Sequence, residues 1–389
     1  MLKILFISDF TESFANSVLK GIVSYGRQQD QWSICRMPLH YKNRIGVEGV
    51  VKWAKDWGVD AVLGTFDITD DLSLFHEEGI VVVAQDYKTR FRTVPNLTSD
   101  YRKTGRMAAE FYMERGFSNF GFFGLDNVCW SDERRDGFKD ALEATGMRSS
   151  FYEYQMTEDE HRWFYDKDSL VKWLNDLPKP IGILACDDNQ GNNLIEACHS
   201  AGISVPEDIS IIGVDNDHLL CDISVPTLSS IQIDIEEGGV RVAKLMEAMV
   251  KNPDMEYKDI VMKPTKIIER VSTASFAKGD PEIQKAIRFI HQNKFRKISV
   301  MDVRSEVALS RSLFERRFKA VTGRAVYQYI SDLRMKGFAD MLLESNEPVV
   351  NIALHFGETD VKSISKRFKA VYGYSPNEWR QMKSGKIRG

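Results

Sequence analysis

The sequence contains few cysteines and no long hydrophobic run. The five cysteines are scattered through 389 residues without a C-x-x-C pair, at Cys35, Cys129, Cys186, Cys198 and Cys221. This spacing argues against a disulfide framework and against a cysteine-ligated zinc site. No stretch of about 18 apolar residues occurs, and the N-terminus reaches Asp9 before a signal-like apolar region has developed. We therefore expect a cytoplasmic chain with reduced thiols and no membrane partner.

Motifs of nucleotide-dependent enzymes are also missing. The first apolar run is followed by SDFTESF rather than by G-x-G-x-x-G, and G-x-x-x-x-G-K-[ST] does not occur. The seven histidines show no metal-ligand spacing. We therefore expect no metal, no cofactor and no enzymatic activity. A NAD-dependent sugar oxidoreductase with a nucleic-acid-binding tail is the alternative from a different functional class.

Charge is divided unevenly along the chain. The net charge is -4, but residues 280–389 contain 21 Lys+Arg and 12 Asp+Glu, whereas residues 1–279 contain 31 and 44. A basic C-terminal region behind an acidic body is typical of a module that meets polyanions such as nucleic acid. A solvated lysine-rich surface is the simpler alternative.

Short apolar runs alternate with helical patterns over residues 1–273. KILFISD, VDAVLGTF, GIVVVAQD, IGILACDD and ISIIGVDND are separated by helix-like segments such as RKTGRMAAEFYMERG. The alternation predicts an α/β region of doubly wound parallel sheets, and its length favours two lobes. Residues 274–280 lose this pattern, which predicts a linker. Residues 281–389 show only helical spacing, which predicts an all-α domain.

Two nearly identical phrases occur in the basic region, RFKAVTG at residues 317–323 and RFKAVYG at residues 367–373. On a helix, each copy with its flank has one apolar face and one polar, mostly basic face. The residues expected on the apolar faces are Phe314, Phe318 and Val321 in the first copy and Ile364, Phe368 and Val371 in the second. The polar faces contain Ser312, Glu315, Arg316 and Lys319 in the first copy and Lys362, Ser365, Lys366 and Lys369 in the second.

A shorter amphipathic segment and a tight turn precede each copy, which predicts two helix-turn-helix units. Residues 325–345 between them have a helix pattern that would be roughly 30 Å long. Two reading helices on one face of B-DNA need a separation of about 34 Å, so both units are expected to read DNA. A purely structural role for one copy is the alternative.

Residues 281–383 resemble the AraC/XylS-type DNA-binding domain of bacterial transcription regulators. The resemblance rests on Ile352 with Ala353, on both RFK phrases and on G-Y-S-P-x-x-W-R at residues 373–380. The sequence departs from that family at Arg304, where a small residue is usual, and at Glu358, where an aromatic is usual. The resemblance implies base contacts by Ser312, Glu315 and Arg316 in the first copy and by Lys362 and Lys366 in the second.

Lysines near the helix ends are expected to touch phosphates, which contributes salt dependence but no sequence choice. The complete set predicted to bind double-stranded DNA is Arg311, Ser312, Glu315, Arg316, Lys319, Lys362, Lys366 and Lys369.

Several apolar runs of the acidic region end in an aspartate, at Asp9, Asp86, Asp187 and Asp215. Ligands of open α/β sheets bind beyond the carboxyl ends of strands, so these residues are expected to share one cleft. Each aspartate alone is equally well explained as the N-cap of a following helix. Carboxylates beside an aromatic ring and an arginine suit a sugar, and Trp130 and Arg134 are the expected ring and cation. A core tryptophan is the alternative for Trp130.

The same region resembles the periplasmic-binding-protein-like core of the lactose/galactose repressor family. The resemblance rests on VPEDISIIGVDND after Gly202, on E-R-x-x-G-F-x-x-A-L at residues 133–142 and on Asp100 with Gly105. It differs at Cys186, where a polar residue is common. It implies sugar contacts by Asp100, Arg134, Asp187 and Asp215. The complete set predicted to bind a ligand is Asp9, Asp100, Trp130, Arg134, Asp187, Asp215 and Asn216.

Such a core followed by an AraC-type domain is the architecture of bacterial xylose operon regulators, which W-x-x-E-R at residues 130–134 also resembles. The resemblance implies a transcription regulator that responds to a pentose, D-xylose first, and binds operator DNA as a homodimer. If the regulator is an activator, RNA polymerase is a further expected partner. A regulator of another sugar and a transport-associated sugar-binding protein are the alternatives, and the basic tail argues against the second.

Overall fold

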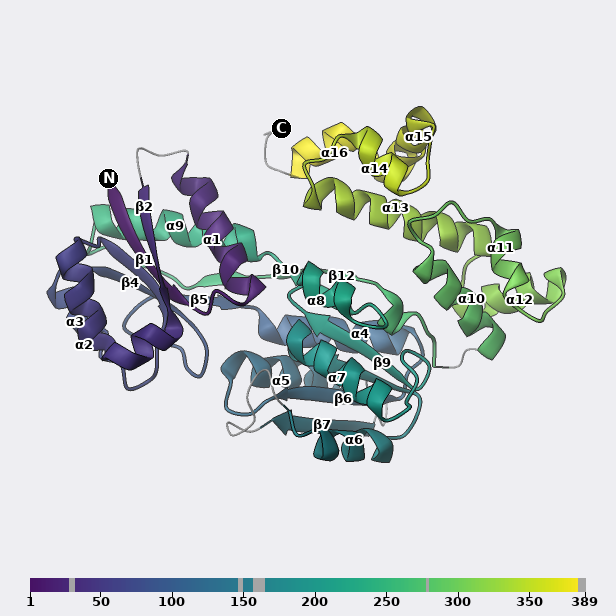
Figure 1. Ribbon diagram of the computed structural model, residues 1–389, viewed down its shortest axis with the longest axis horizontal. Helices are drawn as coiled ribbons and strands as arrows, with labels where there is room; N and C mark the ends of the chain where they lie inside the picture. The colour runs from purple at the N-terminus through teal and green to yellow at the C-terminus, as the bar shows by residue number, and fades with distance from the viewer. Residues whose placement is uncertain (28–31, 146–149, 157–164, 278–279, 384–389) are drawn as a thin grey trace. The chain divides into compact units, whose positions relative to one another are not determined.

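The chain is divided into two compact units, residues 1–273 and residues 274–389. The computed structural model describes residues 1–27, 32–145, 150–156, 165–277 and 280–383. Strands and helices alternate in the first unit, whereas the described part of the second unit contains helices only (Figure 1). Among the helices described, none has the length and apolar character needed to cross a membrane.

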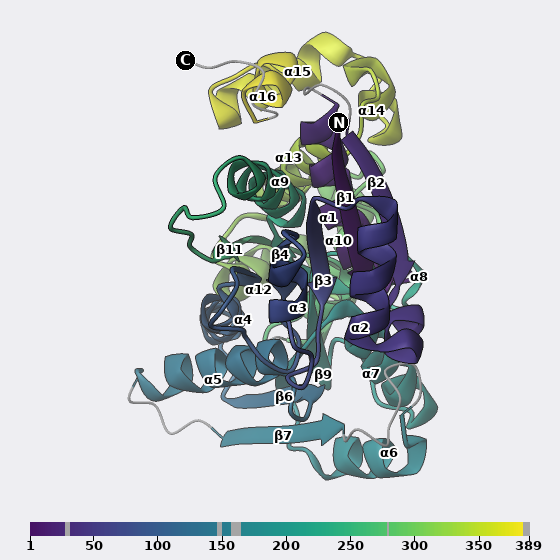
Figure 2. The same cartoon turned by 90° about the vertical axis from the view of Figure 1, so that its left-hand side faces the viewer.

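The first lobe of unit 1 is built on a six-stranded sheet with the order β11-β5-β4-β3-β1-β2. All neighbouring strands in it run parallel. Residues 4–7 in the first strand are fully buried because helices cover both faces of such a sheet. One of these helices, α2, packs on β1 and β2, beside which it lies in Figure 2. The elements of this lobe are β1 (Leu2–Ser8), α1 (Ser13–Gly26), β2 (Trp32–Pro38), α2 (Leu39–Trp57), β3 (Ala61–Thr65), α3 (Ser73–Glu77), β4 (Val81–Gln85), β5 (Asn96–Ser99), α9 (Ile235–Lys251) and β11 (Ile260–Met262).

The second lobe contains another six-stranded sheet, with the order β12-β10-β9-β8-β6-β7. It is parallel except at one edge, where β12 runs antiparallel to β10. The elements of this lobe are α4 (Tyr101–Glu114), β6 (Asn119–Leu125), α5 (Cys129–Glu143), β7 (Ser150–Met156), α6 (Lys167–Asp176), β8 (Ile181–Ala185), α7 (Asp188–Ser200), β9 (Ile209–Val214), α8 (His218–Ile223), β10 (Ser229–Ile233), β12 (Pro264–Ile268) and the 3-10 turn η1 (Val271–Thr273).

The chain crosses between the lobes after β5, after β10 and between β11 and β12. The first crossing leads into α4, which packs along α5. Their backbones are so close that a Cβ atom on Gly105 would lie 2.0 Å from the carbonyl oxygen of Arg134. A larger residue at this position would push α5 away. The close contact therefore fixes the helix that carries both Trp130 and Arg134.

Unit 2 consists of two small helical cores. The first contains Phe314 and Phe318 together with residues of α10 and α11, and the second contains Ile364 and Phe368. The long helix α13 contributes to both, through Ile330 in the first core and Phe338 in the second. The elements are α10 (Pro281–Gln292), α11 (Val300–Ser305), α12 (Arg311–Thr322), α13 (Val326–Glu344), α14 (Val349–His355), α15 (Val361–Tyr372) and α16 (Pro376–Lys383).

The buried faces of α12 and α15 differ from the sequence expectation at one position. Val321 is partly buried in the first core, but Val371 is 58% exposed. The prediction that Val371 points inward is therefore wrong. The next residue, Tyr372, takes its place, because its ring packs against Phe368 and Trp379 at centroid distances of 4.6 and 4.9 Å.

The segment between the two units is partly packed. Ala274 is 2% exposed and belongs to the first core of unit 2, and Phe276 packs against that core. Asp280 accepts a hydrogen bond from the amide of Glu282 and caps α10, which begins with a proline at its first position. Residues 278–279 of the predicted linker lie outside the described residues.

Candidate ligand cavity and DNA-reading helices

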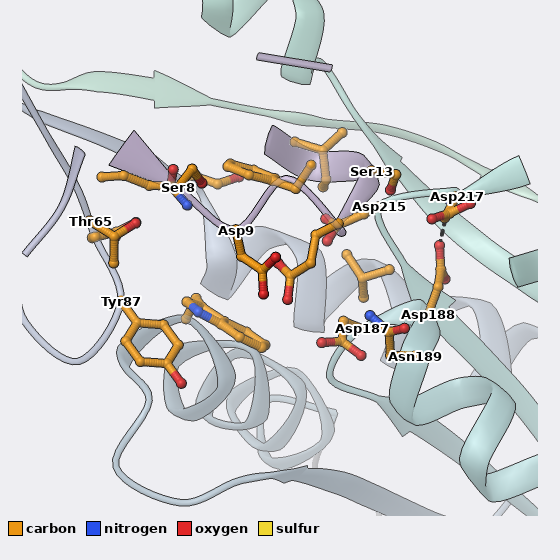
Figure 3. Close-up of a pocket in the computed structure, with 18 of the residues that line it drawn as sticks. Ser8, Asp9, Ser13, Thr65, Tyr87, Asp187, Asp188, Asn189, Asp215 and Asp217 are labelled. Carbon is orange, nitrogen blue, oxygen red and sulfur yellow. Dashed lines mark hydrogen bonds between the residues drawn. The ribbon is translucent and has the colours of Figure 1, made fainter. Parts of the chain in front are cut away.

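A cavity of about 470 Å³ lies between the two lobes of unit 1, and its lining includes side chains that follow strands of both sheets. Asp9 follows β1 in the first lobe, while Asp187 and Asp215 follow β8 and β9 in the second. Figure 3 shows these side chains in the same space. Trp130 and Arg134, both on α5, also line the cavity, as does Asp86, which follows β4. The strand ends thus converge as parallel sheets require.

Two predicted ligand residues lie away from the cavity lining. Asp100 caps α4 instead, because its carboxylate accepts a hydrogen bond of 3.1 Å from the amide of Lys103. Asn216 is 5% exposed, and its side-chain oxygen accepts a hydrogen bond of 3.0 Å from Arg270. In both residues one side-chain oxygen already accepts a hydrogen bond from within the protein.

Arg134 is held tightly although it lines the cavity. It is 4% exposed, its Nη1 donates to the carbonyl oxygen of Cys186, and its Nη2 lies 3.3 Å from Asp215 Oδ1. The guanidinium also lies over the rings of Trp130 and Tyr101, at 5.1 and 5.3 Å from their centroids. Its Nε has no hydrogen-bond partner among the described residues. One donor of a fixed, buried cation is therefore left without a protein acceptor.

Cys186 differs from the polar residue that is common in the lactose/galactose repressor family. Its side chain is fully buried and is not part of the cavity lining. The backbone carbonyl of Cys186 nevertheless accepts the hydrogen bond from Arg134. The position thus orients the arginine through its main chain.

The backbone at the end of β9 adopts an uncommon conformation. Asp215 has φ = 97° and Asn216 has φ = 56°, both in the region that side chains other than glycine seldom occupy. The amide of Asp215 donates to the carbonyl of Ile231 at 2.9 Å, which holds the turn in place. Strained residues of this kind cluster at functional sites, where the strain aims a side chain. Here it accompanies the placement of the Asp215 carboxylate in the cavity lining.

A network of polar side chains joins the two lobes beside the cavity. Asp86 of the first lobe is buried, and burial raises its pKa. The hydrogen bonds that its carboxylate accepts from Thr98, Tyr101 and Arg90 act in the opposite direction but do not cancel this effect. Arg90 also donates two hydrogen bonds to Glu133 on α5, at 2.7 and 3.1 Å. The first lobe is thereby attached to the helix that carries the cavity's arginine.

Asp188, next to the predicted Asp187, also lines the cavity. Asp187 caps α7, because its carboxylate accepts a hydrogen bond of 2.8 Å from the amide of Gln190. It therefore has both predicted roles, as a helix N-cap and as a residue of the cavity lining. Asp188 is 2% exposed, and its Oδ2 accepts the amide of Asp217 at 2.7 Å. Burial and the nearby carboxylates of Asp215 and Asp187 raise the pKa of Asp188 well above its usual value.

Several lining residues were not among those predicted from the sequence. Thr65 and Gln85 end β3 and β4, and the strand-end rule that found Asp9 would have found them too. The side-chain oxygen of Gln85 has no hydrogen-bond partner among the described residues. Tyr101, which contacts Arg134, has no such sequence signal because its position depends on the crossing of the chain between lobes.

The polar faces of α12 and α15 are open to solvent. Asp360 caps α15 by accepting the amides of Lys362 and Ser363 at 3.0 and 3.1 Å. On α12, Arg311 and Glu315 form an exposed ion pair with an Nε to Oε1 distance of 3.0 Å. The eight residues predicted to meet DNA are all exposed, namely Arg311, Ser312, Glu315, Arg316, Lys319, Lys362, Lys366 and Lys369.

The two departures from the AraC/XylS pattern are accommodated differently. Arg304 in α11 is exposed and needs no space in the core. Glu358 is buried, with its side chain 8% exposed, and forms ion pairs with Arg334 and Arg367 at 3.0 and 2.7 Å. A charge cluster thus stands where an aromatic ring is usual in that family.

The chain is similar to known proteins over nearly its whole length. Residues 93–273 match the family described as periplasmic binding protein-like domain, and residues 305–382 match a helix-turn-helix domain. A xylose operon regulatory protein of Haemophilus influenzae is 27% identical over 329 residues, which cover 83% of this chain and 85% of that protein. One from Escherichia coli K12 is 25% identical over 394 residues, covering 98% and 97%.

A solved structure shares the fold over the same extent. A xylose-binding transcription activator aligns with a TM-score of 0.64 and 22% identity, covering 98% of each chain. The two matched domains, their order and these near full-length alignments identify the chain as a periplasmic-binding-protein-like domain fused to an AraC-type helix-turn-helix domain, the architecture of the xylose operon regulators.

Proposed function

We propose that this protein is a sugar-responsive transcription regulator that binds a pentose, D-xylose first, in the cavity of unit 1 and operator DNA through α12 and α15. The observation that carries the proposal is the convergence of Asp9, Asp187 and Asp215 with Trp130 and Arg134 on one cavity. Carboxylates accept hydrogen bonds from sugar hydroxyls, and an indole ring packs on the apolar face of a sugar.

The size of the cavity agrees with a small ligand. Its volume of about 470 Å³ falls in the range of about 300–1,000 Å³ for small-molecule sites. The Nε of Arg134 and the side-chain oxygen of Gln85 are buried near the cavity and have no hydrogen-bond partner among the described residues.

Calorimetry with the full-length protein tests ligand choice. D-xylose is expected to bind more tightly than L-arabinose, D-ribose or D-glucose, and to raise the melting temperature by ligand linkage. If another sugar binds and D-xylose does not, the protein is still a sugar-responsive regulator, but its ligand is that other sugar. Absence of binding by all four would contradict the sugar proposal.

Ligand binding is proposed to act by a population shift. A sugar held by residues of both lobes favours the closed arrangement of the lobes by its differential affinity. This shift would change how two subunits present their DNA-binding units. We also propose that the subunits form a homodimer through unit 1. Sedimentation equilibrium of the full-length protein at tens of micromolar tests this, and a monomer there would contradict it.

DNA reading is proposed for both copies of the repeated phrase. Arg316 can bond guanine bidentately, and a good base pair of this kind discriminates by about 1–3 kcal/mol. Arg316→Ala is expected to relax sequence preference at one contact and Lys366→Ala to weaken a second contact about 10 base pairs away. Footprinting on a duplex selected by the wild-type protein from a random pool measures both. An unchanged footprint with Lys366→Ala would leave only the first copy as a reader.

The regulator proposal has support that the enzyme alternative lacks. The relatives reported above are regulators, and the basic, exposed faces of α12 and α15 suit a polyanion. Because its partner is chromosomal DNA, the protein is expected to act in the cytoplasm. If DNA binding activates transcription, RNA polymerase is the expected protein partner.

A further inference from the structure

The turn between α14 and α15 places one glutamate with little freedom. Gly357 has φ = 66°, its amide donates to the carbonyl of Leu354, and the amide of Glu358 donates to the carbonyl of Ala353. These two bonds form a Schellman motif, which ends α14 and sets the direction of the chain. The side chain of Glu358 therefore starts from a fixed point and enters the core.

Glu358 uses a single oxygen to join two helices. Its Oε1 accepts a hydrogen bond of 3.0 Å from Nη2 of Arg334 on α13 and one of 2.7 Å from Nη2 of Arg367 on α15. The same Arg334 nitrogen donates to the carbonyl of Phe356 at 2.6 Å. The long helix, the turn and the second reading helix are thereby tied at one point.

Two of the three charged groups at this point are buried. The side chains of Arg334 and Glu358 are 6% and 8% exposed, whereas that of Arg367 is 38% exposed. Burial alone would raise the pKa of Glu358, but the hydrogen bond from Arg367 and the charges of both arginines lower it below its usual value. A charge-assisted hydrogen bond is directional, so this contact constrains where α15 lies against α13.

The first copy of the repeat has no equivalent tie within its own turn. The residue fifty positions before Glu358 is Ala308, whose amide donates to the carboxylate of Glu282 on α10. The arginine fifty positions before Arg367 is Arg317, which pairs with Asp280 at the start of α10. The first reading helix is thus anchored to α10, and the second to α13 through Glu358.

We propose that Glu358 is a positioning residue for DNA recognition, which holds α15 against α13 so that the second DNA contact keeps a fixed spacing from the first. Helix α13 has residues in both cores of unit 2, so its position relative to α12 is set by packing. Glu358 then transmits that position to α15. The inference rests on the proposed reading of DNA by both copies.

The test compares variants of the full-length protein on three duplexes. The first duplex is selected by the wild-type protein from a random pool, and the other two carry one base pair more or one base pair less between the two protected sites. Glu358→Gln removes the charge at nearly constant shape. Glu358→Asp keeps the charge but withdraws the carboxylate, and it serves if Glu358→Gln folds poorly by circular dichroism. Asp280→Asn is the matched control in the first copy, since asparagine also caps a helix.

The expected result is specific to the second contact. Both Glu358 variants should bind the selected duplex about tenfold more weakly, with less protection at the site of α15, unchanged protection at the site of α12 and less discrimination between the three spacings. Asp280→Asn should leave the α15 site unchanged. Equal loss of protection at both sites, or unaltered spacing discrimination, would show a purely structural role and overturn the inference. A single protected site with wild-type protein would instead overturn the proposed two-site reading.

Discussion

The two units bury a carboxylate in opposite settings. Asp188 of the first unit lines the cavity near Asp215, and its pKa is raised well above its usual value by burial and then by neighbouring negative charge. Glu358 of the second unit lies between Arg334 and Arg367, and its pKa is lowered despite burial. The difference teaches that burial alone does not decide the direction of a carboxylate's pKa shift, because neighbouring arginines lower the pKa of Glu358 and neighbouring carboxylates raise that of Asp188.

The largest expected effect is on the paired carboxylate. Glu358→Leu should destabilise the second core by about 3–5 kcal/mol, because Arg334 is left buried without a counter-charge. Asp280→Asn, which breaks the more exposed pair with Arg317, should cost no more than about 1 kcal/mol. Hydrogen exchange of the amides of α15 and α12 measures both. Equal losses would remove the distinction between buried and exposed pairing.

The next effect concerns the cavity itself. Asp215→Ala should weaken sugar binding by about 2–5 kcal/mol, since it removes one partner of a charge-assisted contact and leaves Arg134 without its carboxylate. Asp215→Asn is the matched control, because asparagine tolerates the positive φ of this position without the charge. Calorimetry on folded protein compares the three. Wild-type affinity in both variants would place the sugar elsewhere.

A smaller effect is expected from Asp188 and depends on pH. The folded pKa of Asp188 is raised above the unfolded value, which is about 3.9. Folding therefore takes up a proton between these values, and stability falls as the pH rises through that window. Asp188→Asn has no carboxyl group to ionise and lacks this penalty. The melting temperature of Asp188→Asn minus that of wild type should therefore become larger as the pH rises from 4 to 7.

Tryptophan fluorescence can follow this difference, because six of the seven tryptophans lie in residues 1–273. Parallel melting profiles of wild type and Asp188→Asn across the pH range would contradict the raised pKa. They would also remove the contrast with Glu358.

The smallest effect is expected at an exposed charge. Glu315→Ala breaks the ion pair with Arg311. The side chain of Glu315 is 47% exposed and that of Arg311 is 77% exposed. Such pairs contribute about 0–1 kcal/mol, so the free energy of unfolding should hardly change. Urea denaturation measures this free energy. A decrease as large as that of Glu358→Leu would contradict the proposal that the polar face of α12 is free to bind DNA.

Part of this organisation could be predicted from the sequence because it follows from local periodicity. The βαβ pattern indicated the parallel sheets, and the strand-end rule brought Asp9, Asp187 and Asp215 to one cavity. The repeated phrase indicated two amphipathic helices, and the structure has a helix at each copy, α12 and α15. These features need only the period of the chain and the direction of its strands.

Other features could not be predicted because they depend on packing between distant segments. Glu358 and Arg334 are 24 positions apart, and only the fold makes them partners. Asp100 ends a strand as the cavity residues do, but it caps the helix at a crossing between the lobes. Val371 follows the helical period, yet the packing of Tyr372 on Trp379 leaves it exposed.

The shared helix α13 has a consequence for how unit 2 unfolds. Its early residue Ile330 completes one core and its later residue Phe338 completes the other. A chain that ended before α14 would expose the later half of this helix to water and invite aggregation. Loss of either core therefore exposes the part of α13 that completes it, Ile330 in the first core or Phe338 in the second.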